Sequence, residues 1–237
     1  MIGCNTISKK SSYGKRRDEP PLNVAANRRS PLPRCSLIIN YSLLIINMAS
    51  SIWPYKSPGI PDHLFERLPG IPLTKREVRL LLISYLRLEP DSVLWDVGAG
   101  TGTIPVESGL LCPEARIFAV ERDEEVVDLI QHNCTRFGVK NVEVIQGVAP
   151  TCLDQLPESP HRVCLEGGRN VHKILEQVWD YLQPQGRVVA VANNLESLYR
   201  LSEGFAKLQA RNIEVVQSSV NRLENRGTTQ VFAAVDP

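Results

Sequence analysis

The chain has 237 residues, and its 27 Lys and Arg residues against 26 Asp and Glu residues leave a formal net charge of +1. This balance excludes a globally basic nucleic-acid-binding protein. No apolar run approaches the roughly 18 residues that cross a bilayer. Since 43% of the residues are hydrophobic and 22% are charged, we expect a soluble, cytoplasmic domain with one sizeable core, and neither a membrane nor nucleic acid among its partners.

The first 47 residues differ from the rest of the chain. They carry a formal charge of +6, whereas residues 48–237 carry −5, and their Ser-, Asn-, Pro- and Arg-rich composition shows no helical or strand periodicity. The chain has only two methionines, Met1 and Met48. We expect residues 1–47 to be a disordered or misassigned extension and the functional domain to begin near Met48. The apolar run 37–46 leaves a targeting segment as the alternative, although it starts late and no cleavage site follows it.

The cysteines favour neither a disulfide framework nor a structural zinc site. No C-x-x-C pair and no zinc-finger spacing occurs among the six positions, which are Cys4, Cys35, Cys112, Cys134, Cys152 and Cys164. We expect the last four to be small buried apolar side chains, and no metal site is predicted.

A Pro-rich arm precedes the first predicted helix. Residues 53–72 contain prolines throughout, which favours an extended arm with one turn near His63–Leu68. Thr74 and Glu77 then form a T-x-x-E capping box, which predicts a helix running to about Arg87. Its predicted buried face is Val78, Leu81, Leu82 and Tyr85.

Beyond the first helix, strands and helices alternate, which predicts an α/β fold. The predicted strands are 93–97, 116–121, 142–146, 162–165, 187–192, 213–220 and 229–235, and the predicted helices are 103–111, 123–137, 170–182 and 195–209. Such alternation implies a parallel sheet covered on both faces. The last two strands, separated by a turn at 225–227, imply an antiparallel edge because parallel strands need a crossover. We therefore expect a seven-stranded, mostly parallel sheet with an antiparallel last strand.

A glycine-rich loop follows the first strand. Asp96 precedes the loop Gly98-Ala99-Gly100-Thr101-Gly102, in which glycines permit positive φ and the next helix offers free N–H groups to a ligand. Nineteen residues beyond Gly102, Glu121 ends the second strand, where a carboxylate can accept hydrogen bonds from the hydroxyls of a ribose. The combination predicts a nucleotide site.

The loop does not match the commonest nucleotide patterns. The dinucleotide fingerprint requires glycine where Thr103 stands, and the Gly-Lys-Ser/Thr of the phosphate-binding loop is absent. The segment resembles the D-x-G-x-G-x-G loop of S-adenosylmethionine-dependent methyltransferases. That resemblance implies a class I methyltransferase (Rossmann-like) fold and S-adenosyl-L-methionine as the cofactor.

Short segments outside the loop resemble one methyltransferase family. They are Gly59–Asp62, Leu73–Arg79, Gly147–Pro150, Glu166–Gly168 and Asn225–Thr228, and with the loop they are similar to the CbiT family of precorrin-6Y or cobalt-precorrin-6B methyltransferases. The resemblance covers essentially residues 53–235. It implies methyl transfer to carbon 15 of a tetrapyrrole precursor of cobalamin, with loss of CO2 from the ring C acetate, and assembly as a homo-oligomer in which the arm is an inter-subunit or lid element.

The resemblance also implies the cofactor contacts. By position they are Thr74, Gly98, Ala99, Gly100, Thr101, Gly102, Glu121 and Ala149, and we add Asp96 as a residue that braces the loop and meets the ammonium group of the ligand. Two residues depart from the family pattern, which often has Asp where Val148 stands and commonly has Asp where Glu121 stands. Thr74 can serve both as helix cap and as contact. No general base is predicted, and none of the four histidines is assigned to catalysis.

A polycarboxylate substrate requires a local cationic patch, because the domain itself is negative. Arg169 is the first candidate because it follows the fourth strand at the carboxyl edge of the sheet. Arg222 and Arg226 near the final hairpin are the other predicted substrate contacts. Lys56 and Arg79 are weaker candidates.

Two other functions remain open. One is the same fold acting on another small molecule or on a protein, although the N/D-P-P-Y-type motif of amino-methylating relatives is absent after the fourth strand, where Leu165-Glu166-Gly167-Gly168 stands. The other is a non-catalytic scaffold that binds S-adenosylmethionine and regulates a partner, against which the intact loop and Glu121 weigh.

Overall fold

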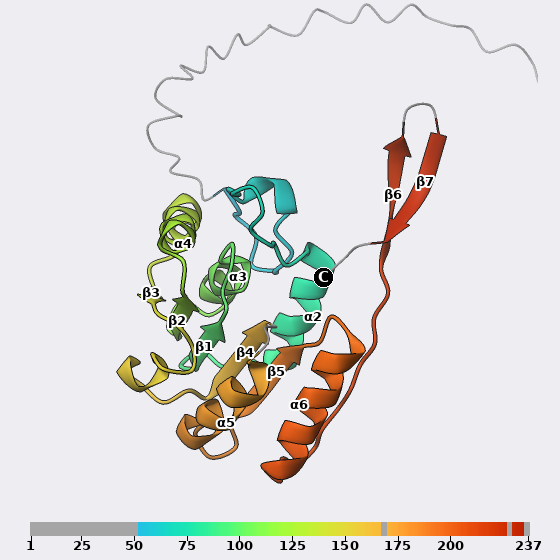
Figure 1. Cartoon of the computed structure of the whole chain (residues 1–237). Helices are drawn as coiled ribbons and strands as arrows, with labels where there is room; N and C mark the ends of the chain where they lie inside the picture. Colours follow the sequence, from blue (N-terminus) through green and yellow to red (C-terminus); the bar gives the residue numbers. More distant parts are fainter. Residues whose placement is uncertain (1–51, 167–169, 227–228, 235–237) are drawn as a thin grey trace, which may run out of the picture. The chain divides into compact units, whose positions relative to one another are not determined.

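The structure, a computed structural model, describes residues 52–166, 170–226 and 229–234. Five strands form one sheet of order β3-β2-β1-β4-β5 in which every neighbouring pair is parallel (Figure 1). The strands are β1 (Val93–Val97), β2 (Arg116–Glu121), β3 (Val142–Gln146), β4 (Arg162–Glu166) and β5 (Arg187–Val191). The helices are α2 (Arg76–Leu86), α3 (Thr103–Leu111), α4 (Glu124–Phe137), α5 (Val171–Tyr181) and α6 (Leu195–Lys207), with short 3₁₀ turns η1 (Asp62–Leu64) and η2 (Leu153–Gln155).

The elements from β1 to α6 agree with the sequence prediction within two residues at each end. The central strands β1 and β4 are short and almost wholly buried, as expected of parallel strands covered on both faces, whereas β3 at the sheet edge carries the exposed Glu143. The helix α4 illustrates the sequence signals that define the helices. Its buried face holds Val126, Ile130, Cys134 and Phe137 at helical spacing, and Gly138 ends it in the left-handed conformation with φ 72°.

The two faces of the sheet bury different side chains because strand residues alternate. Trp95, Val163 and Leu165 pack with α5 and α6 on one face. Leu94 and Cys164 pack with α2 and α3 on the other. Cys112, Cys134, Cys152 and Cys164 are buried free thiols, which confirms their predicted packing role.

The chain runs outward through β1, β2 and β3, then crosses back to β4 and β5. The strand order therefore reverses between β1 and β4, and open α/β sheets bind ligands outside the carboxyl ends of the strands at such a point. Helices lie on both sides of the sheet (Figure 1). We refer to the space outside the carboxyl ends of β1 and β4 as the switch-point crevice.

The last two strands correct the prediction of a seven-stranded sheet. β6 (Asn221–Arg226) and β7 (Thr229–Ala234) pair antiparallel with each other in a separate two-stranded sheet. The predicted strand 213–220 is not a strand, and its Ile213, Val215 and Val216 are 53%, 66% and 51% exposed. The pairing of Arg226 with Thr229 fixes the hairpin register, so β6 spans the six residues opposite β7, not the apolar run before it.

The first helix starts and ends within two residues of the prediction, but its predicted capping box is wrong. The helix α2 has Lys75 as its N-cap residue, without a side-chain cap, and the N–H of Arg76 donates instead to Oδ1 of Asp62 in the arm, at 2.9 Å. A carboxylate from another segment thus replaces the expected Thr74 cap. The buried face is shifted by one residue, to Arg79, Leu82, Ile83 and Leu86, because Arg79 is paired in the interior.

The arm packs on its own domain. Ile60 and Phe65 are 0% and 4% exposed and join a cluster with Val106 and Phe137, and the predicted turn is the 3₁₀ turn η1. This packing, within the described residues, makes the first part of the arm a layer of the core.

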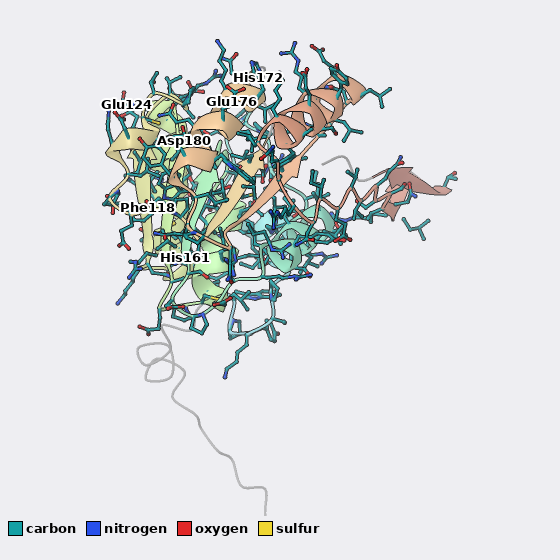
Figure 2. The ribbon with its side chains drawn as sticks, turned by 90° about the horizontal axis from the view of Figure 1, so that it is seen from below. Phe118, Glu124, His161, His172, Glu176 and Asp180 are labelled. Carbon is teal, nitrogen blue, oxygen red and sulfur yellow. The ribbon has the colours of Figure 1, made fainter. Side chains whose placement is uncertain are left out.

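Three polar side chains, His172, Glu176 and Asp180, follow one another along α5 (Figure 2). Glu176 and Asp180 are exposed, whereas Nδ1 of His172 is buried without a hydrogen-bond partner among the described residues. His161 accepts a hydrogen bond at Nδ1 from the N–H of Val93 at 3.0 Å. In the part of the chain that the structure describes, no helix combines the length and apolar character needed to cross a membrane.

Candidate functional site

The glycine-rich loop lies at the carboxyl end of β1 and turns the chain into α3. Gly98, Gly100 and Gly102 have φ values of 85°, 52° and 78°, a region that L side chains rarely adopt. The N–H groups of Gly98 and Ala99 both donate to the carbonyl of Val120, at 3.0 and 3.2 Å. These bonds hold the loop against the end of β2.

Close packing adds a second reason for glycine at two of these positions. A Cβ on Gly102 would lie 2.9 Å from Cγ2 of Ile130 in α4, and a Cβ on Gly98 would lie 3.2 Å from the carbonyl oxygen of Glu166. The loop therefore closely approaches both α4 and the end of β4. Its backbone lines the switch-point crevice, as the sequence predicts.

Glu121 ends β2 and reaches back to the loop. Its Oε2 accepts from the N–H of Gly100 at 3.1 Å, and its Oε1 accepts from the N–H of Arg122 at 2.8 Å. A carboxylate has about four acceptor positions, so these two bonds leave capacity for further donors. The carboxylate is thus held beside the loop, where the sequence places the ribose acid.

Asp96 is the least satisfied polar side chain of the site. It is 0% exposed, and among the described residues neither of its oxygens has an N–H or O–H donor. Its strand partner in the register of β1 and β4 is Cys164, and Glu166 follows two residues later on the same face. One oxygen of Asp96, Sγ of Cys164 and one oxygen of Glu166 all lie within 4.8 Å of one another.

Burial and mutual repulsion perturb this pair of acids. Burial, followed by repulsion from Glu166, raises the pKa of Asp96 well above its usual value. Burial also raises the pKa of Glu166 to about 7, against the opposing effects of the Thr74 hydrogen bond and of the Arg79 charge. The site is therefore short of positive charge, which a cationic ligand would supply.

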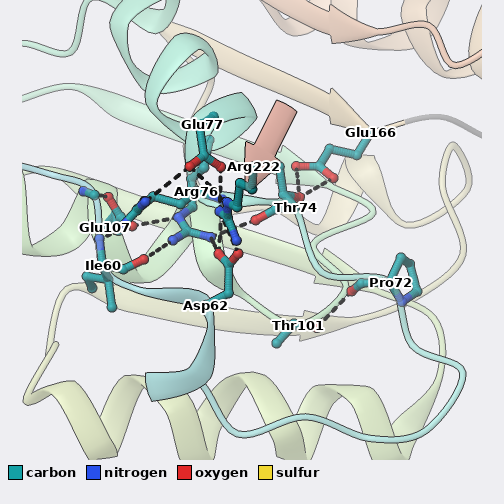
Figure 3. A network of polar contacts seen from close by, with 12 residues as sticks. Ile60, Asp62, Pro72, Thr74, Arg76, Glu77, Thr101, Glu107, Glu166 and Arg222 are labelled. Atoms are coloured by element: carbon teal, nitrogen blue, oxygen red, sulfur yellow. Dashed lines mark hydrogen bonds and ion pairs between the residues drawn. The ribbon is translucent and has the colours of Figure 1, made fainter. Parts of the chain in front are cut away.

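The two threonines of the predicted site hold the backbone and side chains together. Oγ1 of Thr74 donates to the carboxylate of Glu166, with both oxygens at 2.7–2.8 Å, and Oγ1 of Thr101 donates to the carbonyl of Pro72 at 2.7 Å (Figure 3). Thr101 is 2% exposed, and its side chain fastens the loop to the arm.

Ala149 follows β3 at the same edge of the sheet. It packs against the core cluster on the α5 face, and the nearby N–H of Gly147 donates to the carbonyl of Glu121 at 2.8 Å. Val148, where the family often has Asp, is 59% exposed. The structure thus brings Thr74, Asp96, the loop, Glu121 and the segment of Ala149 to one edge.

Of the three candidate substrate cations, Arg222 is the one whose side chain the structure describes. Arg169 lies outside the described residues, and Arg226 ends β6 without a described side chain. The guanidinium of Arg222 binds Glu77 and, at 3.0 Å, Asp62. Hydrogen bonding by Arg222 lowers the pKa of Glu77 to about 2.

Arg79 is excluded as a substrate contact because it is buried in an ion-pair network. Its Nε donates to Glu107 at 2.5 Å, and the two side chains are 0% and 1% exposed. The same guanidinium donates to the carbonyls of Thr74 and Ile60 and contacts Asp62 (Figure 3). The network joins the arm to α2 and α3 beside the site.

Glu166 is the residue of this site that the sequence did not single out. In the sequence it appears only within the segment Glu166–Gly168 of the family resemblance. In the structure it ends β4, the strand next to β1, and its side chain lies on the same face of the sheet as Cys164 and Asp96. The signal that identifies it is the strand order, which no sequence pattern gives directly. A surface hollow between α5 and α6 is lined by residues of those two helices alone.

Comparison with known proteins identifies the family of the chain. Residues 67–237 match the family model described as "Precorrin methyltransferase domain". A protein of Pyrobaculum calidifontis named "Probable cobalt-precorrin-6B C(15)-methyltransferase (decarboxylating)" is 40% identical over 187 residues, which cover 78% of this chain and 95% of that protein. A Salmonella typhimurium protein named "Cobalt-precorrin-6B C(15)-methyltransferase (decarboxylating)" is 30% identical over 74% of this chain and 91% of its own length.

Solved structures give the same result. The precorrin-6y C5,15-methyltransferase of Geobacter metallireducens matches with a TM-score of 0.70 and 32% identity, over 76% of this chain and 94% of that one. The structure named precorrin 8W decarboxylase from Methanobacterium thermoautotrophicum matches with a TM-score of 0.68 and 27% identity, over 75% and 95%. The predicted class I methyltransferase fold is confirmed. The chain belongs to the precorrin methyltransferase family and is a methyltransferase.

Proposed function

We propose that the chain transfers a methyl group from S-adenosylmethionine to carbon 15 of a precorrin or cobalt-precorrin and removes CO2 from the ring C acetate. The relatives' names support this reaction. The single observation that carries the proposal is the buried carboxyl group of Asp96 at the switch point, neither oxygen of which has an N–H or O–H donor among the described residues. A donor that carries both an ammonium and a sulfonium group provides the positive charge that Asp96 lacks.

The residues of the crevice divide the binding work. The donor supplies an already activated methyl group. The backbone of Gly98–Gly102 lies against its adenosine, Glu121 accepts hydrogen bonds from the ribose hydroxyls, and Asp96 receives the ammonium. Ala149 and Thr74 contribute contacts at the rim. Because the donor needs no further activation, orientation and exclusion of water supply most of the acceleration of methyl transfer.

Isothermal titration calorimetry with S-adenosylmethionine tests the cofactor contacts. Glu121→Ala removes the ribose acceptor, worth roughly 2–4 kcal/mol for two charge-assisted hydrogen bonds, so the affinity should fall about 30- to 1,000-fold. Glu143→Ala in β3 changes an exposed acid elsewhere and serves as the matched control, with unchanged affinity. Equal affinities for all three proteins would remove Glu121 from the site.

A turnover assay tests the reaction. The protein is incubated with S-adenosylmethionine and with either metal-free or cobalt-containing substrate, and the product mass is measured. The proposal predicts one methyl group gained and one CO2 lost. A folded preparation that binds the donor and converts neither substrate would instead favour another acceptor or a non-catalytic role.

A further inference from the structure

Resting on the proposed function, we propose that Glu166 is a catalytic acid–base residue that protonates the side-chain carbon from which CO2 departs. Loss of CO2 breaks the bond between the carboxyl carbon and its methylene neighbour, and the electron pair stays on the methylene carbon and the conjugated macrocycle. That carbon must gain one proton to become a methyl group. Glu166 in its acid form gives the proton and becomes a carboxylate.

Glu166 can also accept the proton that methylation releases, so the protons of the whole reaction balance. A ring carbon that gains a methyl group and returns to conjugation releases one proton. The Glu166 carboxylate can accept that proton, which restores its acid form. One proton is released and one is consumed, so a single carboxyl group suffices and no other co-reactant is required.

The position of Glu166 suits this role. It is the last residue of β4, next to the end of β1 at the point where the strand order reverses. Its side chain is only partly buried, whereas Asp96 beneath it is 0% exposed. The hydroxyl of Thr74 holds the carboxyl group at 2.7–2.8 Å, which fixes its position at the carboxyl end of β4 (Figure 3).

The surroundings of Glu166 keep a proton available near neutral pH. The charged and titratable groups that face it are Asp96 of β1, Cys164 of β4 and Arg79 of α2, and Glu121 of β2 acts on Asp96. Burial raises the pKa of Glu166 to about 7, and two carboxyl groups this close resist ionising together. The opposing charge of Arg79 is already paired with Glu107.

Other acids and bases among the described residues are less suitable. Glu121 is bound to amides of the loop and its surroundings, and Asp96 lies below the surface of the crevice. His161 accepts from the first residue of β1, at the opposite end of the strand, and His172 lies on α5 over the other face of the sheet. Glu166 combines access to the crevice with titration near neutrality.

The test compares the full chain with Glu166→Gln and Glu166→Asp, and measures CO2 release, methyl transfer and donor affinity separately. Gln keeps the shape and can still bond Thr74, but it cannot donate and accept the proton. CO2 release by Glu166→Gln should fall at least 100-fold, while donor affinity changes less than 3-fold. If methylation comes first, a methylated product that retains its carboxyl group accumulates.

The pH profile separates a chemical role from a structural one. CO2 release by the native chain from substrate that has already been methylated should decline as pH rises above about 7, because this step starts from the acid form of Glu166, which is then lost. Glu166→Asp should recover part of the activity and displace that decline, and Glu143→Gln on β3 should leave both rate and profile unchanged. A merely structural role would lower the rates without displacing the profile.

Two results would overturn the proposal. One is CO2 release by Glu166→Gln within 3-fold of the native rate. The other is a loss of donor affinity that lowers methyl transfer and CO2 release in parallel, which would make Glu166 a binding residue. If the native chain itself neither methylates nor decarboxylates, the proposed function fails first, and that outcome is distinct from both.

Discussion

Asp96 and Glu166 place two carboxyl groups close together, the first fully buried and the second partly buried. Each costs stability when ionised, because burial and mutual repulsion disfavour the charged forms. The cost is tolerated where a bound cation compensates it. At the residue scale, these acids therefore lower the stability of the ligand-free protein and raise its affinity for a cationic ligand.

Asp96→Asn should separate these two effects. Removing the buried charge should stabilise the ligand-free protein by roughly 1 kcal/mol at pH 7, or about 2–4 °C in Tm, and weaken binding of S-adenosylmethionine by about 10-fold or more. Thermal melts and calorimetry on the same preparations measure both. A variant that is less stable and binds normally would contradict the assignment of Asp96 to the ligand.

The raised pKa of Glu166 predicts how stability depends on pH. Between its ordinary value near 4.5 and the folded value of about 7, the folded state holds the proton more tightly than the unfolded state. The free energy of unfolding therefore falls as pH rises through this window. Relative to the native chain, Glu166→Gln should gain on the order of 1–3 kcal/mol between pH 4.5 and 7, measured by urea denaturation at each pH. Parallel curves for the two proteins would show that Glu166 titrates normally.

At the element scale, the loop between β1 and α3 is fixed by backbone conformation and by contact with α4. Gly102→Ala introduces both a positive φ penalty and a clash with Ile130 at 2.9 Å. Gly138→Ala, at the end of α4, is the matched control because its φ is also positive, at 72°, and nothing lies within 4 Å of the added Cβ. We expect a loss of about 1 kcal/mol for the control and at least about 2 kcal/mol for Gly102→Ala, with weaker donor binding only in the latter. Equal losses of stability in Gly102→Ala and Gly138→Ala would mean that α4 shifts to accommodate the added methyl group.

The elements also show what the sequence could and could not predict. β1–β5 and their helices follow from short apolar runs and from stop signals such as Gly138, since burial on both faces leaves little freedom. The first strand of the final hairpin was predicted at 213–220 because the apolar pattern there is typical of a strand, whatever its partner. In the structure, pairing with β7 begins at Asn221.

The candidate site divides in the same way. The loop and Glu121 were predictable because their signals are local in the sequence. The Asp62 cap of α2 and the Thr74–Glu166 contact were not, because each joins residues that only the folded chain brings together. Arg79 seemed a surface cation for the same reason: its partner Glu107 is 28 residues away.

At the scale of the whole molecule, the catalytic unit should lie within residues 48–237. The family match covers residues 67–237, and a segment of 187 residues covers 95% of the Pyrobaculum calidifontis relative. A chain that begins at Met48 should therefore match the full chain within about 2–3 °C in Tm and 3-fold in turnover. Mass spectrometry of the native N-terminus would then identify the physiological start, and loss of activity on removal of residues 1–47 would contradict the predicted boundary.

The assembly and the substrate patch also belong to this scale. A domain of charge −5 must bind a polycarboxylate through local cations, and Arg169 remains the predicted first contact. Arg222 is engaged by Glu77 and Asp62, so it can serve a substrate only by sharing its donors or leaving those acids. Homo-oligomerisation remains a prediction of the family resemblance.

The most direct measurement is a crystal structure of the chain with S-adenosylhomocysteine. We predict that the adenosine lies over Gly98–Gly102, the ribose hydroxyls on Glu121, and the ammonium on Asp96 at the carboxyl end of β1. A ligand bound elsewhere on the domain, or an ammonium remote from Asp96, would contradict this prediction.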